Sequence, residues 1–193
     1  MGQRLVEFLR SINLKSTWFP EFKNQKLLDQ YLSNMQQYAY DFQVIMVRER
    51  INVYKHAFLK AKNGSIVFID RSILGDLTFA EMQHKKGFIS DDEFDVYLDL
   101  IKCEHLYEPD LILFLECNPE TCMNRLLKRD NRSEVSSYNL GYLNDLLESY
   151  NLILVQSGCQ VYRHKWDESI EIPIEEKKCC EILDLIVKLI LKV

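Results

Sequence analysis

An acid, an arginine and a serine follow directly after a short apolar run near the middle of the chain. The run covers residues 66–69, and Asp70, Arg71 and Ser72 come next. The carboxyl ends of buried parallel strands face the crevice where α/β proteins bind ligands, so these side chains are placed for chemistry. A carboxylate beside a guanidinium suits metal-bound phosphate, whereas an ordinary salt bridge at a strand end explains the same residues. This stretch alone leaves both interpretations open.

A second set of polar residues recurs at helical spacing. Tyr40, Gln43, Val47 and Arg50 lie three to four residues apart in a stretch with a helical pattern, and therefore on one face. Such a stripe can bind the edge of a flat heterocycle, because a carboxamide offers both a donor and an acceptor. Core packing with polar ends explains the stripe equally well, and in isolation it is the favoured interpretation.

Arginines gather on one face of a later helical stretch. Arg125 and Arg129 are four residues apart, with Arg132 and Glu134 just beyond. Two interpretations fit this pattern, a mobile arginine cover over phosphates and a solvated helix end.

The elements that must position these residues alternate between helices and strands. This alternation predicts an α/β fold with a parallel sheet. The predicted strands are 16–19, 66–69, 111–115 and 160–164, and Glu21 follows the first of them after Pro20. The predicted helices cover residues 5–12, 26–59 with a break near Ser33, 77–85, 90–106, 119–134, 142–154 and 179–191.

Composition excludes several classes of protein. The 193 residues are enough for one domain with its own core, so we expect a single domain over residues 1–193. A formal net charge of −5 gives no overall basic footprint for nucleic acid, and no apolar run is long enough to cross a membrane. The six cysteines have neither disulfide-framework nor zinc spacing, and the start lacks a secretory signal. We therefore expect a cytoplasmic protein, with a mitochondrial one left open if the N-terminus is truncated.

Taken in order, these features resemble the deoxynucleoside kinases, the family of deoxycytidine, deoxyguanosine and insect multisubstrate kinases. The resemblance runs from about Leu5 to the C-terminus. It implies a P-loop kinase-like three-layer α/β fold that transfers the γ-phosphate of ATP to the 5′-hydroxyl of a deoxynucleoside. It rests on PE at 20–21, FQ at 42–43, Arg50, DRS at 70–72, Asp76 and the arginine helix ending at Glu134.

The resemblance implies roles for the catalytic positions. Glu21 matches the general base that takes the proton from the 5′-hydroxyl. Asp70 matches the acid that contacts Mg²⁺ through water, and Arg71 matches the arginine that steadies the 5′-oxygen and the transferred phosphoryl group. These roles suit phosphoryl transfer, which depends mostly on positioning and charge neutralisation.

Other matches concern the nucleoside. Gln43 matches the glutamine at the base edge, and Phe42 and Phe79 match the aromatics that wall the base. Arg50 and Asp76 match a pair at the exocyclic edge that goes with deoxycytidine or purine deoxynucleosides. The resemblance therefore favours deoxyadenosine, deoxyguanosine or deoxycytidine over thymidine.

The sugar and the phosphates have their own matches. Tyr31 and Glu134 match the pair on the 3′-hydroxyl, although one extra residue separates Tyr31 from Gln43. The lid, about residues 125–138, matches through Arg125 and Arg129. Its third arginine departs from the family pattern, because Asn131 holds that place and Arg132 comes one residue late. The resemblance also implies a homodimer.

One family feature is missing. The printed sequence has neither the first apolar strand nor the GxxxxGK[S/T] loop whose amides hold the ATP phosphates. We therefore expect weakened ATP binding and turnover, and a parallel sheet without its central first strand. A truncated gene product is one explanation. Two alternative functions stay open: a P-loop-less paralogue that binds nucleoside or an intact kinase subunit without turnover, and a nucleoside monophosphate kinase.

Overall fold

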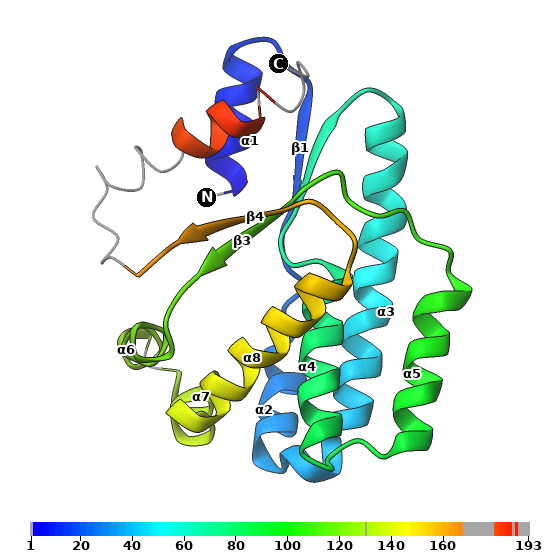
Figure 1. Ribbon diagram of the computed structural model, residues 1–193, viewed down its shortest axis with the longest axis vertical. Coiled ribbons are helices and arrows are strands. Elements are labelled where there is room, and N and C mark those ends of the chain that lie inside the picture. Colours follow the sequence, from blue (N-terminus) through cyan, green and yellow to red (C-terminus); the bar gives the residue numbers. More distant parts are fainter. Residues whose placement is uncertain (1, 130, 168–179, 187, 189–193) are drawn as a thin grey trace. The chain divides into compact units, whose positions relative to one another are not determined.

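The computed structural model describes residues 2–129, 131–167, 180–186 and 188 (Figure 1). The chain divides into two compact units. The first comprises the residues up to Pro20, His56–Asp70 and the C-terminal part from Glu168, and the second comprises Glu21–Lys55 and Arg71–Asp167. Each unit is described by itself below, and the expectation of a single domain stays a prediction.

The first unit contains a parallel pair of strands packed with a helix. Strands β1 (Ser16–Phe19) and β2 (Ile66–Ile69) pair in parallel, with Phe19 opposite Ile69. Helix α1 (Gly2–Ser11) buries the apolar face formed by Leu5, Val6 and Leu9, since these residues recur on one side of the helix. Both strands were predicted from the sequence with these bounds.

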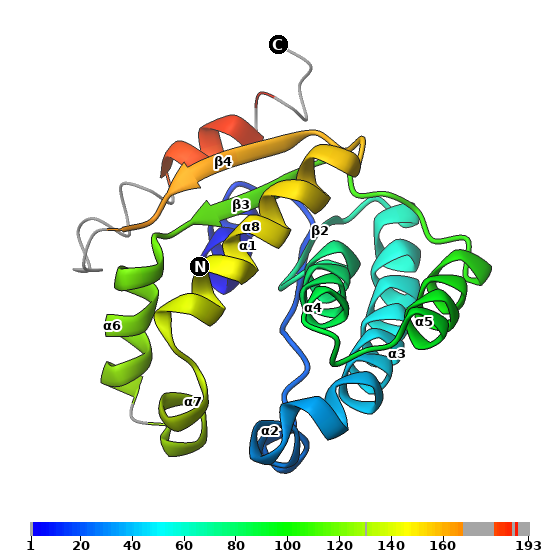
Figure 2. The same cartoon turned by 60° about the horizontal axis from the view of Figure 1, so that its bottom comes forward.

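The second unit holds most of the helices and a second pair of strands (Figure 2). Strands β3 (Ile112–Glu116) and β4 (Val161–Lys165) also pair in parallel. Its helices are α2 (Gln25–Ser33), the part of α3 (Met35–Lys62) up to Lys55, α4 (Ile73–Lys85), α5 (Asp91–Cys103), α6 (Pro119–Arg129), α7 (Arg132–Ser137) and α8 (Leu140–Gln156).

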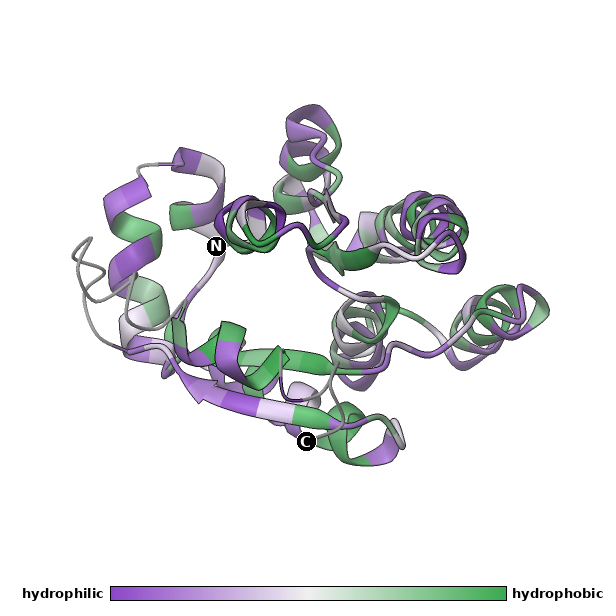
Figure 3. Ribbon diagram, turned by 90° about the horizontal axis from the view of Figure 1, so that it is seen from above, coloured by the Kyte–Doolittle hydropathy of each residue, from purple (hydrophilic) through white to green (hydrophobic). Residues whose placement is uncertain are grey.

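The core of the second unit lies among helices α2 to α5. It contains Tyr31, Val47, Ile51, Ala80 and Tyr97, each at most 3% exposed. Hydrophobic and hydrophilic residues alternate around the helices (Figure 3), as expected for helices that each bury one face. This core fixes α3 against α4, and these two helices carry most of the predicted nucleoside-binding residues.

Local sequence signals explain several element boundaries. Ser90 caps α5 and forms the predicted capping box with Glu93. The predicted break near Ser33 separates α2 from α3. The prediction of one helix over residues 119–134 is wrong, because the structure has two helices there. Helix α6 ends at Arg129, and Asn131, with extended backbone, stands at the N-cap position of α7. The predicted terminal helix, 179–191, lies partly outside the described residues. Within it, residues 180–186 are described and are helical.

The predicted mixture of helices and parallel strands is confirmed. Within the described residues, the four strands form two separate two-stranded sheets, β1–β2 and β3–β4. None of the helices in this part of the chain is both long and apolar enough to span a bilayer.

Candidate active site

Glu21 and Arg71 form an ion pair in the second unit. Arg71 Nε lies 3.0 Å from Glu21 Oε1, and the two side chains are 33% and 22% exposed. Phe19 and Ile69, the last residues of β1 and β2, are paired in parallel. Glu21 and Arg71 each follow by two residues, so they leave the paired strands at the same level. An acid and a cation are thus held together where the sequence predicted chemistry, and both are still accessible to a ligand.

The Arg71 side chain lies back along the first turns of α4. Its backbone is in the left-handed region, with φ of 66°, and Ser72 caps the helix that follows. A β-carbon on Gly75 would come within 2.6 Å of Arg71 Cγ, so only glycine leaves room for this side chain. The guanidinium then lies 4.8 Å from the centre of the Phe79 ring, within the range of a cation–π contact.

Arg50 and Asp76 form a second, buried ion pair. Arg50 Nε lies 2.9 Å from Asp76 Oδ2 and Nη2 lies 3.4 Å from Oδ1, with side chains only 1% and 2% exposed. Arg50 Nη2 is also 3.6 Å from Glu21 Oε1. Burial raises the pKa of Asp76, and the hydrogen bond and charge of Arg50 act in the opposite direction. Glu21, Arg50, Arg71 and Asp76 therefore make one charge-balanced group, which we call the charged cluster.

Five buried side-chain polar atoms of the second unit have no hydrogen-bond partner among the described residues, and those of Gln43 and Tyr97 lie near the charged cluster or on the same helix face as Arg50. Gln43 is 2% exposed, and its Nε2 has no hydrogen-bond partner among the described residues. Tyr97 is fully buried, and its hydroxyl also has no hydrogen-bond partner among the described residues. Burial raises the pKa of Tyr97, as does the charge of Asp76. Buried donors without partners are uncommon, so the Gln43 amide is available to a ligand acceptor.

Tyr31 and Phe42 stack on one another, with ring centres 4.4 Å apart and planes 15° from parallel. Tyr31 is 2% exposed, and its hydroxyl accepts a hydrogen bond from Gln83 Nε2 at 2.5 Å. Sequence reasoning missed Gln83, because nothing in its spacing on α4 points to a partner on α2. The predicted contact of Tyr31 with a sugar hydroxyl stays a prediction.

Helix α7, which lies in the predicted lid, packs on α2 (Figure 2). Ser133 Oγ donates to Asp29 Oδ1 at 2.5 Å, and Ser137 Oγ donates to the Leu32 carbonyl at 3.4 Å. Arg129 Nη2 lies 3.8 Å from Glu134 Oε2. This pairing joins two of the predicted lid residues, whereas Arg132 at the start of α7 is exposed.

Arg125 contacts groups just beyond the carboxyl ends of β3 and β4. Its Nη2 donates to the Trp166 carbonyl at 2.5 Å and its Nη1 lies 3.2 Å from Cys117 Sγ. Burial, together with Cys122, raises the pKa of Cys117 to about 12, so this thiol stays protonated. The predicted role of Arg125 at the phosphates stays a prediction.

Asp70 is the last residue of the first unit and directly precedes Arg71. Its backbone N–H donates to the Phe19 carbonyl at 2.9 Å. Within the described part of the chain, no three acidic, histidine or cysteine side chains gather as a metal-binding cluster. A single carboxylate nevertheless fits Mg²⁺, which keeps several waters and binds mainly to substrate phosphates.

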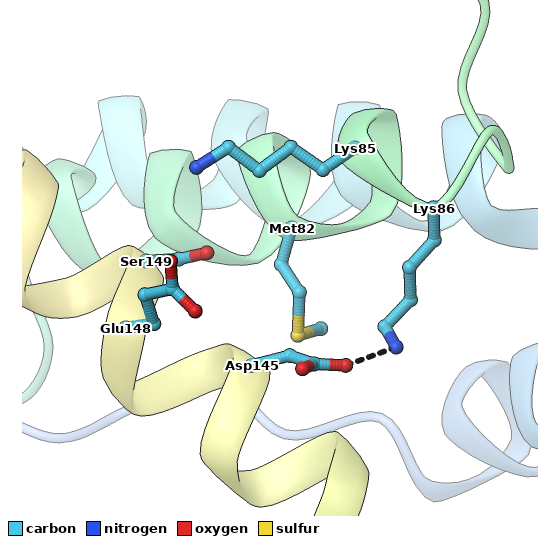
Figure 4. A pocket seen from close by; sticks show the side chains of 6 residues that line it. All are labelled: Met82, Lys85, Lys86, Asp145, Glu148 and Ser149. Atoms are coloured by element: carbon cyan, nitrogen blue, oxygen red, sulfur yellow. Dashed lines mark hydrogen bonds and ion pairs between the residues drawn. The ribbon is translucent and has the colours of Figure 1, made fainter.

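A separate hollow of about 220 Å³ lies between α4 and α8 (Figure 4). Its lining contains an ion pair between Lys86 and Asp145, and the nearly buried side chains of Met82 and Ser149. None of the predicted site residues lines this hollow.

Solved structures show which class of fold this is. The structure of a deoxyadenosine kinase from M. mycoides with bound dATP matches with a TM-score of 0.70 at 17% identity, covering 93% of this chain and 91% of that chain. The same kinase with bound dCTP matches with a TM-score of 0.68 at 16% identity, covering 100% of this chain and 94% of that chain. The chain therefore has the P-loop kinase-like fold of these enzymes, as predicted.

Comparison with sequence families is more specific. The family model "Deoxynucleoside kinase" matches residues 3–190, and the chain belongs to this family. It is 26% identical over 159 residues to the deoxyadenosine kinase of Dictyostelium discoideum, which covers 80% of this chain and 63% of that protein. It is 30% identical over 142 residues to the probable deoxycytidine kinase of fowlpox virus, which covers 72% of this chain and 59% of that protein. The chain thus spans about three fifths of the length of these relatives.

Proposed function

We propose that this protein transfers the γ-phosphate of ATP to the 5′-hydroxyl of a deoxynucleoside. The ion pair between Glu21 and Arg71, inside the charged cluster of a chain from the deoxynucleoside kinase family, carries the proposal. It joins the proposed proton acceptor to the cation proposed for the moving phosphoryl group. Phosphoryl transfer asks for such an arrangement, since neutralising charge and positioning the nucleophile supply most of the catalysis.

The proposed chemistry assigns each side chain one task. Glu21 takes the proton of the 5′-hydroxyl as this oxygen attacks the γ-phosphorus, and the bond to the leaving ADP oxygen breaks. Arg71 then balances negative charge on the transferred group. Asp70 would hold, through water, a magnesium ion that arrives with ATP and would neutralise phosphate charge. The lid arginines Arg129 and Arg132 are proposed to meet the phosphates.

The proposed substrates are deoxyadenosine, deoxyguanosine and deoxycytidine. The buried Arg50–Asp76 pair presents fixed charges, and the free Nε2 of Gln43 offers a donor to an acceptor on the base. Phe42 and Phe79 are proposed to sandwich the base, and Tyr31 and Glu134 to hold the sugar. Deoxyadenosine kinases and a probable deoxycytidine kinase among the relatives support this choice.

The test is an assay of the 193-residue chain with each deoxynucleoside, magnesium and millimolar ATP. High ATP is needed because the printed sequence contains no GxxxxGK[S/T] loop. We expect monophosphate product, and a fall of at least about a hundredfold in Glu21→Gln, which keeps the shape of the side chain but cannot take the proton.

A matched control is Glu120→Gln, a change at an acid in the first turn of α6, which we expect to leave turnover unchanged. Calorimetric binding of deoxynucleoside without any product would contradict catalysis and support the non-catalytic alternative. Equal turnover of wild type and Glu21→Gln would remove Glu21 from the mechanism.

A further inference from the structure

Tyr150 on α8 lies at the centre of a row of aromatic and cationic groups. Its ring meets the Phe79 ring edge-on, with centres 6.3 Å apart and planes at 85°. On another side it meets Phe114 of β3, with centres 5.4 Å apart. Arg71 lies over Phe79 and Arg163 lies over Phe114, so the row has a cation at each end. Every member belongs to the second unit.

The Tyr150 hydroxyl also comes close to the stem of Arg71. The position that a β-carbon on Gly75 would occupy is 3.4 Å from the Tyr150 hydroxyl and 2.6 Å from Arg71 Cγ. The two side chains therefore meet on α4 over Gly75, which has no side chain. The pKa of Arg71 is raised: burial alone would lower it, but the acidic groups around the guanidinium, Tyr150, Glu21 and Asp76, together outweigh that effect. Burial also raises the pKa of Tyr150, so its hydroxyl stays protonated beside Arg71.

The other end of the row fixes Tyr150 itself. Arg163 Nη1 donates to Asn151 Oδ1 at 2.8 Å, one residue beyond Tyr150, and lies 3.4 Å from Glu116 Oε1. These contacts tie α8 to the β3–β4 pair, which gives Tyr150 a rigid base. Side chains on helices and strands hold a site more accurately than side chains on loops.

We propose that Tyr150 is a positioning residue that, together with Glu21, holds Arg71 in place as the anion-binding group of the site. Glu21 holds the guanidinium by charge, and Tyr150 restrains the stem and supports Phe79. The inference rests on the proposed function, because it assigns Arg71 to the transferred phosphoryl group. Among the residues the sequence singled out, none comes from α8, so this support is an addition to the site.

Two variants separate the contribution of the Tyr150 ring from that of its hydroxyl. Tyr150→Leu removes the ring and the hydroxyl, whereas Tyr150→Phe keeps the ring. We expect Tyr150→Leu to weaken calorimetric binding of dAMP, dGMP or dCMP about tenfold and that of the parent deoxynucleoside less than twofold. Tyr150→Phe should restore most of the binding. The matched control is Tyr107→Leu, at a tyrosine that is 66% exposed.

The outcomes are distinct from those that test the proposed function. Monophosphate binding by Tyr150→Leu at the wild-type level would overturn the inference. A parallel loss of both ligands would also overturn it, because a general packing role predicts that result. If the wild type binds no deoxynucleoside, the proposed function fails, but the inference can still be tested by the exchange rate of the Arg71 Nε proton, measured by NMR. An acceleration of about fivefold or more in Tyr150→Leu would support the inference. An unchanged exchange rate would overturn it.

Discussion

The charged cluster and the lid helix both depend on charged side chains, but they differ in exposure. In the cluster, Arg50 and Asp76 are 1% and 2% exposed, and both oxygens of Asp76 face Arg50. At the lid, Arg129 is 65% exposed and reaches Glu134 at 3.8 Å. Removal of one partner from a buried ion pair lowers the free energy of unfolding strongly, whereas an exposed ion pair contributes little to it. The cluster therefore has a fixed geometry, whereas the ion pair between Arg129 and Glu134 in the predicted lid adds little to stability.

The comparison predicts the largest loss at Arg50. Arg50→Met leaves the Asp76 carboxylate buried without its partner, so we expect the free energy of unfolding to fall by about 3–5 kcal/mol. Urea denaturation measures this change. The double variant Arg50→Met/Asp76→Leu removes both charges and should recover much of the loss. A fall of less than about 1 kcal/mol in the single variant would show that the pair is not the rigid part of the site.

A smaller loss is expected where a neutral buried hydrogen bond is broken. Gln83→Leu leaves the Tyr31 hydroxyl without its donor, which should cost about 1–3 kcal/mol in urea denaturation. Adding Tyr31→Phe removes the orphaned hydroxyl as well, and the double variant should then be the more stable of the two. The reverse order would mean that the hydroxyl has found another partner.

At the lid, the expected effect on stability is close to zero. Arg129→Met removes an exposed, long ion pair, so the free energy of unfolding should change by less than about 0.5 kcal/mol. The same denaturation experiment serves as the measurement, with Lys102→Met, from another exposed pair, as its control. A loss above about 1.5 kcal/mol would place the lid in the same class as the cluster.

The smallest effect concerns Asp29, which receives a hydrogen bond from Ser133. Hydrogen bonds from Ser133 and Gln25 lower the pKa of Asp29 below 3.8. Since the folded-state pKa is the lower one, the contact stabilises the fold above the ordinary carboxyl pKa and is lost as pH falls through the folded value. Ser133→Ala should move the pKa of Asp29 back toward 3.8, seen in an NMR titration of its carboxyl carbon. An unchanged titration would mean that α7 is not docked on α2 in solution.

The sequence predicts the charged cluster better than the lid for a physical reason. Glu21 and Arg71 each follow a strand by two residues, and Gln43 and Arg50 share one helix face, so regular geometry determines where they lie. At the lid, the chain leaves α6 at Arg129 and enters another helix at Arg132. Spacing across such a break does not determine where Arg132 and Glu134 lie relative to Arg125 and Arg129. Arg125 lies before the break, and its contacts with Cys117 and Trp166 depend on how α6 packs beside the strand ends, which no local pattern in the sequence marks.

Other parts of the site depend on contacts between distant elements. Tyr150 and Gln83 reach their partners from elements packed side by side, and no local pattern marks them. The left-handed backbone of Arg71 was equally hidden, because arginine has no preference for that conformation. Gly75 was the available signal, since a glycine inside the first turn of a helix indicates close approach by another group.

Arg71 thus serves two demands that oppose one another. Glycine or asparagine at this position would adopt the left-handed backbone with less strain, but either substitution would remove the positive charge. A substitution that relieves this strain would therefore remove the group proposed to bind phosphate. Backbone strain of this kind is typical of functional positions, so the left-handed conformation of Arg71 is consistent with the role proposed for its charge.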